Sequence, residues 1–450
     1  MHERQTTPRA EVLGGVTTFM TMAYILFVNP QILGLGGDGL PFAQVLTVTA
    51  LVAGVMTLLM GLVANYPFAI APGLGLNAFV AFSLVAGDGL TFPEAMGVVV
   101  MEGILITVLV ITGFREAVLN AIPMVLKKAI GAGIGLFIAI IGFASAGFTV
   151  QGQGPLLDLG PIGTTRLVLF VGGLVLAFTL IARAVKGALL YAILATTIAG
   201  VVVNEVFYGG DLWAEVGPGI GQVPTQVIAA PDFALVGAFS FGFFGKLGFL
   251  AAAIAVFSLM LSDFFDTVGT AVGLGDEAGF LREDGTLPDM DRVLLVDSVA
   301  AAAGGAVSAS SATTYIESAS GIADGARTGL ASVVTGVLFL LAMFLSPLAG
   351  VIPAEATATA LVVVGFLMIS AIVDIDWRDP TEAAPAFLVM VGMPFTYSIA
   401  DGIGMGFVAY VALKAFTARG SEVHPMMWVA AAAFVVHFAI DPIKGLLLGG

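Results

Sequence analysis

The feature that most constrains this chain is a succession of long apolar segments with few charged residues inside them. An α-helix needs about 20 apolar residues to cross the hydrocarbon core of a bilayer. Charged residues make up only 10% of the 450 residues, whereas a soluble domain carries about 25%. The chain therefore cannot cover a water-facing surface of its size, and the sequence predicts an all-α polytopic protein of the lipid bilayer.

We expect fourteen membrane spans, several of them short. The spans lie at residues 12–31, 43–63, 68–86, 94–113, 127–146, 166–183, 187–207, 247–274, 292–305, 311–328, 329–349, 356–373, 381–397 and 400–416. A further apolar stretch at 426–440 is too short to assign. The N-terminal residues lack the pattern of a cleavable signal peptide, so the first apolar run is expected to be a mature span.

The basic residues support this topology, because Lys and Arg gather on the cytoplasmic side of a membrane protein. With the N-terminus in the cytoplasm, Arg166 and Lys246 fall outside, Lys444 depends on the unassigned stretch, and every other basic residue falls inside. A long loop at 208–246 separates seven spans from seven. An odd number of spans in each half inverts the second half, which is typical of secondary transporters in the cell membrane.

Two of the spans contain helix breakers at membrane depth. The third span carries Pro67 and Pro72 before Asn77, and the tenth carries a Gly- and Ser-rich run before Tyr315 and Glu317. Irregular backbone is tolerated there only where it lines a cavity or is buried in protein. Interrupted spans in corresponding positions of two halves indicate a transporter's binding site. We expect half-helices to begin at Asn77 and Glu317 and to present their N–H groups to a ligand; alternatively, the glycines only allow close helix packing.

The eighth span carries two acids in an otherwise apolar segment, Asp263 and Asp266. A charged side chain at the bilayer centre costs about 3 kcal/mol or more, so such a residue is a functional candidate. Residues three and four apart share a helix face. One polar stripe is therefore expected of Asp263, Asp266, Thr267 and Thr270, with Phe264 and Phe265 on the opposite side. The alternative is a helix-packing pair that Ser and Thr hydroxyls satisfy.

These acids also suggest a coupling ion. Burial and neighbouring negative charge both favour the protonated form of a carboxyl group. At least one of Asp263, Asp266 and Glu317 is therefore expected to hold a proton near neutral pH, as a proton-coupled carrier requires. Asp297 in the ninth span is a weaker candidate for this role, and an interhelical hydrogen bond is expected of it. Glu102 in the fourth span is expected to make an interhelical contact as well.

The composition excludes several classes of site and partner. The chain has no cysteine and three histidines, so we expect no metal, disulfide or cofactor. The net charge of -15 disfavours a nucleic-acid partner and suggests a halophilic organism. Residues 273–276 spell the GxGD of intramembrane aspartyl proteases, but the partner motifs of that class are absent, so we interpret the match as chance. The predicted protein is a transporter, not an enzyme.

Four segments carry a family resemblance. TTFMTMAYILFVNP (17–30), GLGLNAF (73–79), SDFFDTVGT (262–270) and TTYIESASGI (313–322) resemble the adenine/guanine/hypoxanthine permease branch of the xanthine/uracil permease (nucleobase–cation symporter) superfamily. The resemblance extends from about residue 9 to about residue 416. It implies two inverted seven-helix repeats with short strands in spans 3 and 10, proton-coupled import of purine nucleobases, and often a homodimer.

The resemblance also implies a division of the chain into domains. A core domain would comprise residues 1–113 and 247–349, a gate domain residues 114–207 and 350–416, an extracellular connector residues 208–246, and a C-terminal segment residues 417–450. An elevator-like movement of the core against the gate would then expose the site to each side of the membrane in turn.

By motif, the resemblance places Asn77, Asp263 and Glu317 in contact with the base, with Asp266 as a coupling residue. The chemistry of a flat, neutral base adds Phe79 or Tyr315 as ring neighbours, and Ser318 completes the predicted substrate-binding set. Spans 3, 8 and 10 contain a single basic residue, Arg327 near the end of span 10, and this scarcity argues against an anionic substrate.

Three alternatives remain at this point. The same fold could carry xanthine, uracil or another small neutral molecule. The coupling ion could be Na⁺ in place of H⁺. The protein could also be a channel or passive facilitator, although paired interrupted spans with buried acids suit alternating access better.

Overall fold

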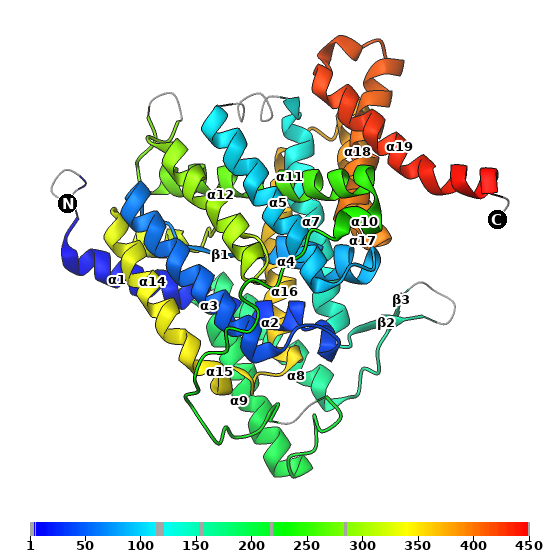
Figure 1. The fold of residues 1–450 in the computed structure, drawn as a ribbon. Coiled ribbons are helices and arrows are strands. Elements are labelled where there is room, and N and C mark those ends of the chain that lie inside the picture. The colour runs from blue at the N-terminus through cyan, green and yellow to red at the C-terminus, as the bar shows by residue number, and fades with distance from the viewer. Residues whose placement is uncertain are drawn as a thin grey trace.

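The computed structural model describes residue 4 and residues 6–113, 121–152, 157–216, 219–282 and 286–448. For residues 371, 374 and 440–448 it describes the backbone alone. The described chain is a bundle of helices with four short strands (Figure 1).

The first half contains most of the expected spans as single helices. Its elements are α1 (Pro8–Met22), α2 (Ile25–Leu33), α3 (Phe42–Leu59), β1 (Ile70–Pro72), α4 (Leu74–Ala78), a π-helix (Phe79–Gly87), α5 (Phe92–Thr112), α7 (Met124–Ser145), β2 (Thr149–Gln151), β3 (Leu157–Leu159), α8 (Thr165–Ala182) and α9 (Ala188–Tyr208). The first span differs from the prediction, because turns at Ala23 and Tyr24 divide it into α1 and α2.

The second half repeats this order. Its elements are α10 (Phe243–Leu247), α11 (Phe249–Glu277), α12 (Met290–Ala306), β4 (Ala312–Thr314), α13 (Ser318–Ala323), α14 (Gly329–Ala342), α15 (Ser346–Ala349), α16 (Ala354–Ile369), α17 (Pro380–Thr396), α18 (Ile399–Phe416) and α19 (Pro425–Leu448). The unassigned stretch at 426–440 is thus helical and belongs to α19. Nine helical segments of the described ranges are long and apolar enough to cross a bilayer, and other apolar helices are shorter.

The predicted breaks in spans 3 and 10 are confirmed, and they meet each other. Strands β1 and β4 pair antiparallel, with Ala71 opposite Thr313. The ladder continues on both sides, since the Tyr315 N–H donates to the Ala69 carbonyl and the Gly73 N–H to the Ser311 carbonyl, each at 2.9 Å. Each broken span thereby provides hydrogen-bond partners for backbone N–H and C=O groups of the other. Lipid could not provide such partners.

The fifth spans of the two halves, α7 and α16, also cross each other closely. A Cβ built on Gly135 would lie 2.7 Å from the Gly365 carbonyl oxygen, and one built on Gly365 would lie 2.4 Å from the Gly135 carbonyl oxygen. Only glycine at both positions allows the backbones this approach. Corresponding spans therefore meet twice, at β1–β4 and at α7–α16, as an inverted repeat requires.

Three groups of helices pack around these crossings. Helices α1, α3 and α14 pack together, as do α5, α11 and α12, while α7 packs on α16 and α17 (Figure 1). A cavity lies where α7 and α16 face the paired strands.

Candidate functional site

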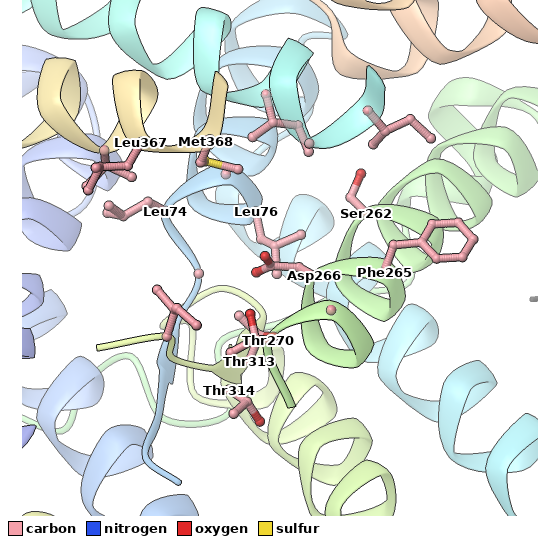
Figure 2. A pocket seen from close by; sticks show the side chains of 18 of the residues that line it. Leu74, Leu76, Ser262, Phe265, Asp266, Thr270, Thr313, Thr314, Leu367 and Met368 are labelled. Atoms are coloured by element: carbon pink, nitrogen blue, oxygen red, sulfur yellow. The ribbon is translucent and has the colours of Figure 1, made fainter. Parts of the chain in front are cut away.

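The candidate site is a cavity of about 670 Å³ between the paired breaks and the α7–α16 pair. This volume is in the range of a small-molecule site, about 300–1,000 Å³. One wall is apolar and comes from Ile130, Ile134, Leu367 and Met368. Figure 2 shows the opposite wall, where Asp266 and Thr270 of α11 lie near Thr313 and Thr314 of β4. The cavity thus sets polar groups against an apolar surface.

The break in span 10 places Glu317 and Tyr315 on the cavity. Glu317 is the N-cap residue of α13, so the prediction that a half-helix begins there is confirmed. The Tyr24 hydroxyl donates to Glu317 Oε1 at 2.5 Å, and the Tyr315 hydroxyl donates to the Pro72 carbonyl at 2.5 Å. Tyr24, Tyr315 and Glu317 all line the cavity. These contacts join α2, β1 and α13 around one space.

Helix α11 divides its polar residues between two faces. Its cavity face carries Ser262, Phe265, Asp266, Gly269 and Thr270, at the spacing of one helix face. Phe265 was expected opposite Asp266, and this expectation is wrong, because a residue adjacent in sequence lies only about 100° around an α-helix.

Asp263 and Thr267 form the other polar face of α11 and point away from the cavity. Both side chains are buried. Thr267 Oγ1 lies 2.7 Å from Thr313 Oγ1, and the Ser311 hydroxyl lies 3.3 Å from Asp263 Oδ2. The predicted single stripe is therefore two stripes, one toward the cavity and one toward β4.

Four predicted substrate-binding residues lie behind the cavity wall and not on it, namely Asn77, Phe79, Asp263 and Ser318. Helix α4 begins at Leu74, so the expectation that Asn77 starts a half-helix is wrong. Asn77 is fully buried, and in the described part of the chain neither its Oδ1 nor its Nδ2 has a hydrogen-bond partner. Ser318 Oγ accepts from the Ala69 N–H at 2.9 Å and thereby holds β1 against α13.

A layer of carboxyl groups lies behind the strands. Asp297 Oδ1 accepts from the Thr314 N–H at 2.8 Å and from its hydroxyl at 2.7 Å. Asp297 Oδ2 accepts from the Thr267 hydroxyl at 2.6 Å. The interhelical hydrogen bond expected of Asp297 is confirmed. Glu102 likewise reaches across from α5, with Oε2 lying 3.3 Å from the Ser311 hydroxyl.

The sequence interpretation did not single out Tyr24, Lys127 or Lys128, which are among the residues that line the cavity. Tyr24 lies inside the motif segment 17–30, which was the available signal. The two lysines lie near the start of α7, and Lys127 Nζ lies 5.1 Å from the centroid of the Phe265 ring. Arg327, the one basic residue of spans 3, 8 and 10, is not among the residues that line the cavity, but α7 places two lysines there. Among the described residues no cluster of three or more His, Cys, Asp or Glu suits a metal ion.

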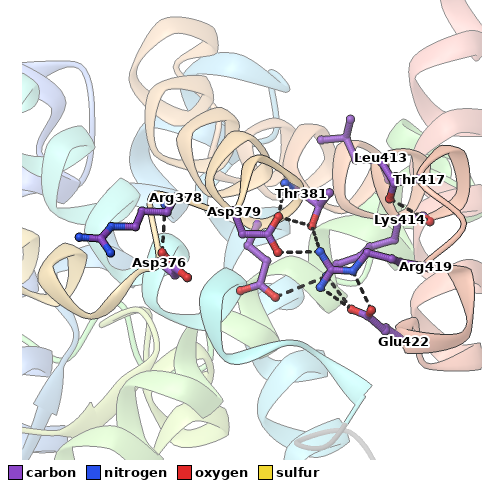
Figure 3. Close-up of polar contacts among 10 residues, drawn as sticks. Asp376, Arg378, Asp379, Thr381, Leu413, Lys414, Thr417, Arg419 and Glu422 are labelled. Atoms are coloured by element: carbon purple, nitrogen blue, oxygen red, sulfur yellow. Dashed lines mark hydrogen bonds and ion pairs between the residues drawn. The ribbon is translucent and has the colours of Figure 1, made fainter.

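An ion-pair network ties the C-terminal helices together outside the site (Figure 3). Arg419 Nη1 lies 2.7 Å from Asp379 Oδ2, and its Nε lies 2.7 Å from Glu422 Oε1. The buried Lys414 Nζ lies 2.8 Å from Glu422 Oε2. Hydrogen bonds from Arg419 and then Lys414 lower the pKa of Glu422 to about 2, and the Arg419 guanidinium also lowers the pKa of Asp379.

An inverted pair of helical repeats, with two broken spans beside a cavity between helix groups, defines a membrane transporter. The fold of this chain is similar to that of the transmembrane domain of the cyanobacterial bicarbonate transporter BicA, with a TM-score of 0.62 over 88% of this chain and 97% of that one. At 16% sequence identity this likeness shows the 7+7 inverted-repeat fold alone.

The sequence defines the family. Residues 9–440 match the Permease family of the xanthine/uracil type, and the chain belongs to it. The adenine permease AdeP of Escherichia coli is 39% identical over 97% of this chain and 94% of its own length. The guanine/hypoxanthine permease PbuG of Bacillus subtilis is 39% identical over 97% of both chains. The resemblance seen in the motifs is therefore confirmed, and the chain is a multi-pass membrane protein of a nucleobase permease family.

Proposed function

We propose that this protein imports purine nucleobases, namely adenine, guanine or hypoxanthine, by proton symport. The observation that carries the proposal is a cavity with carboxyl and hydroxyl groups on one wall and aliphatic side chains on the other, in a chain that is similar to adenine and guanine/hypoxanthine permeases throughout its length. A purine is flat and neutral, with N–H donors along its edge and two apolar faces. The cavity offers a complement to each of these features.

The proposed base site is formed by the groups that face the cavity. Asp266 and Glu317 accept N–H bonds, Tyr24 and Tyr315 offer hydroxyls, and the rings of the tyrosines add apolar surface. The wall of α7 and α16 packs against the base. The motifs assign Asn77 and Asp263 to the base, but these two side chains would reach it only if β1 and β4 moved. We therefore propose that they lie behind the base site and respond to binding through the two strands.

The proposed transport step is an elevator-like movement of the core domain (1–113 and 247–349) against the gate domain (114–207 and 350–416). The polar wall belongs to the core, and the apolar wall belongs to the gate. Such a boundary allows sliding, because the gate wall makes few directional bonds. With the N-terminus in the cytoplasm, Lys127, Lys128 and Ser370 lie at the inner end of their spans, and the cavity faces the cytoplasm.

The proposal also includes the membrane location, the oligomeric state and the orientation of the protein. We place it in the cell membrane as a homodimer, with the loop at 208–246 outside. Arg166 on that side is paired with Glu355, which supports the orientation because a basic residue outside is rare and here has its charge compensated.

Transport of labelled bases tests the function. Purified protein in liposomes is given radiolabelled adenine, hypoxanthine, guanine, xanthine or uracil, with pH and sodium gradients imposed separately. Accumulation of a purine driven by the pH gradient is expected, and a protonophore should abolish it. Accumulation driven only by sodium would change the coupling ion, uptake of xanthine or uracil alone would change the substrate, and uptake that never exceeds equilibrium would indicate a facilitator.

A further inference from the structure

Glu102 and Asp263 meet across one hydroxyl group behind the cavity. The Ser311 Oγ lies 3.3 Å from Glu102 Oε2 and 3.3 Å from Asp263 Oδ2. A serine hydroxyl has a single proton and can donate it to one acceptor at a time. Glu102 Oε1 and Asp263 Oδ1 are buried, and no N–H or hydroxyl group of the described residues donates to either of them. Two carboxyl groups therefore share one donor.

The neighbouring carboxyl group shows what a charged acid in this layer requires. Asp297 accepts three hydrogen bonds, two from Thr314 and one from Thr267. A carboxylate with this many donors is stable without a proton. Asp297 therefore receives three hydrogen bonds from β4 and α11. Glu102 and Asp263, which lie in the same layer, have only the Ser311 hydroxyl as a donor between them.

Among the described residues, no cation compensates for the missing donors. Within the described part of the chain neither Glu102 nor Asp263 forms an ion pair, and both side chains are fully buried. The titratable groups that act on them are further acids, Asp297 from α12 and Asp266 one turn along α11. A second unpaired buried charge would cost several kcal/mol. The pair is stable when one of its two carboxyls is protonated and donates to the other.

We propose that Glu102 and Asp263 hold one shared proton, and that this pair is the proton-binding site of the transport cycle. The inference rests on the proposed proton symport and adds to it a residue of the fourth span. The proton comes from water on the outer side and returns to water on the inner side, and no bond to the base is made or broken. Because Glu102 and Asp263 carry the proton, Asp266 and Glu317, which line the cavity, are available to bind the base.

The strands connect this proton to the base. Ser311 lies next to β4, and its carbonyl accepts from the N–H of Gly73, which lines the cavity. A base that presses on Gly73 therefore moves Ser311 relative to both carboxyls. Protonation of the pair and occupation of the cavity are in this way linked through the β1–β4 ladder, and each of two linked binding events changes the affinity of the other by the same factor.

The test uses the full-length protein and the variant Glu102→Gln. The glutamine amide donates to Asp263 as a protonated Glu102 would, so the local packing is preserved, but it cannot release a proton. We expect pH-gradient-driven accumulation of adenine to fall by about tenfold or more, while exchange of labelled for unlabelled adenine without a gradient is retained. The dependence of adenine affinity on pH should flatten. Accumulation as in the wild type would overturn the proposal.

A second measurement does not depend on transport. Infrared spectra of the wild type should contain the carbonyl stretch of a protonated carboxylic acid that is lost in Glu102→Gln and equally in Asp263→Asn, with no further loss in the double variant. The matched control is Glu355→Gln, which removes a buried acid that pairs with Arg166 and should leave this band in place.

The two measurements separate the two claims. Absence of the band in the wild type, or its persistence in both variants, would contradict the shared proton even if the protein accumulates bases. If the wild-type protein shows the band but accumulates no base, the shared proton is supported and the proposed symport is contradicted. If Glu102→Gln does not fold, the band in Asp263→Asn decides.

Discussion

The hydroxyl of Tyr24 donates a hydrogen bond of 2.5 Å to Glu317 Oε1. Tyr24 lies at the break between α1 and α2, and Glu317 begins α13, so the contact joins the broken first span of one half to the broken third span of the other. Thr21 strengthens this junction, because its hydroxyl lies 3.3 Å from the Glu317 carbonyl. The orientation of the carboxylate in the cavity therefore depends on a residue almost 300 positions earlier in the chain.

Replacing Tyr24 by phenylalanine should weaken base binding. The change leaves the ring and removes the donor that orients Glu317. A hydrogen bond to a charged group contributes about 1.5–3 kcal/mol, so we expect the affinity for the transported base to fall by about tenfold or more. The measurement is isothermal titration of the purified protein with adenine, hypoxanthine and guanine. Tyr191→Phe is the matched control, because Tyr191 is 45% exposed on α9; an equal loss in both variants would refute the role of the contact.

Glu317→Gln should impair both binding and accumulation. The amide oxygen can still accept from Tyr24, but one acceptor oxygen and the charge are lost at the cavity. We expect a loss of affinity of about tenfold or more and a matching loss of proton-driven uptake. Uptake and affinity at the wild-type level would remove Glu317 from the site. Glu11→Gln is a useful control, since Glu11 is also buried but caps the start of α14 through the Thr328 and Ala331 amides.

The crossing of α7 and α16 predicts a steric effect on stability. Gly365→Ala places a Cβ 2.4 Å from the Gly135 carbonyl oxygen, so the helices must separate, at a cost of about 1–3 kcal/mol. Gly172→Ala in α8 is the matched control, because no atom of the described residues lies within 4 Å of its Cβ and the helix gains about 1 kcal/mol from alanine. Thermal unfolding in detergent should therefore show a lower midpoint for Gly365→Ala and an unchanged or higher one for Gly172→Ala. Equal midpoints would mean that the crossing tolerates a methyl group.

The Arg419 network predicts a stability change in acid. The pKa of Glu422 is about 2 in the folded protein, below its ordinary value of 4.5. A group whose folded pKa is depressed stabilises the fold above its unfolded pKa and loses this effect as pH falls through the folded pKa. The contribution of Glu422 should therefore be complete at neutral pH and fade from about pH 4.5 to about pH 2. Unfolding midpoints of the wild type and Glu422→Gln should differ at pH 7 and converge at low pH; a constant difference would contradict this assignment.

The sequence predicts well which spans are interrupted, but it predicts poorly which of their side chains point into the cavity. Pro72 and Gly73 cannot continue a helix in lipid, so the break before Asn77 could be seen from residue types alone. The burial of Asn77 could not, because it depends on α4 beginning at Leu74. The first span has no such breaker at Ala23 and Tyr24, so its division was missed. Lys127 was predicted to begin the fifth span and lies in the first turn of α7, which begins at Met124, but its position on the cavity depends on the packing of distant helices.

A final prediction concerns the ion pair between Lys186 and Asp324. Lys186 lies between α8 and α9 in the proposed gate domain, and Asp324 ends α13 in the proposed core domain, so an elevator movement must break this contact. Because both groups are partly exposed, the pair contributes only about 0–1 kcal/mol, enough to bias two states without locking either.

Asp324→Asn should therefore shift the protein away from the conformation described here and change the rate of uptake more than the affinity for the base. The charge-reversed double variant Lys186→Asp/Asp324→Lys should recover the wild-type rate, whereas each single reversal should not. Distances between spin labels on α9 and α13, measured with and without base, report the movement directly. If those distances stay fixed during transport, the two helix groups move as one body and the elevator proposal fails.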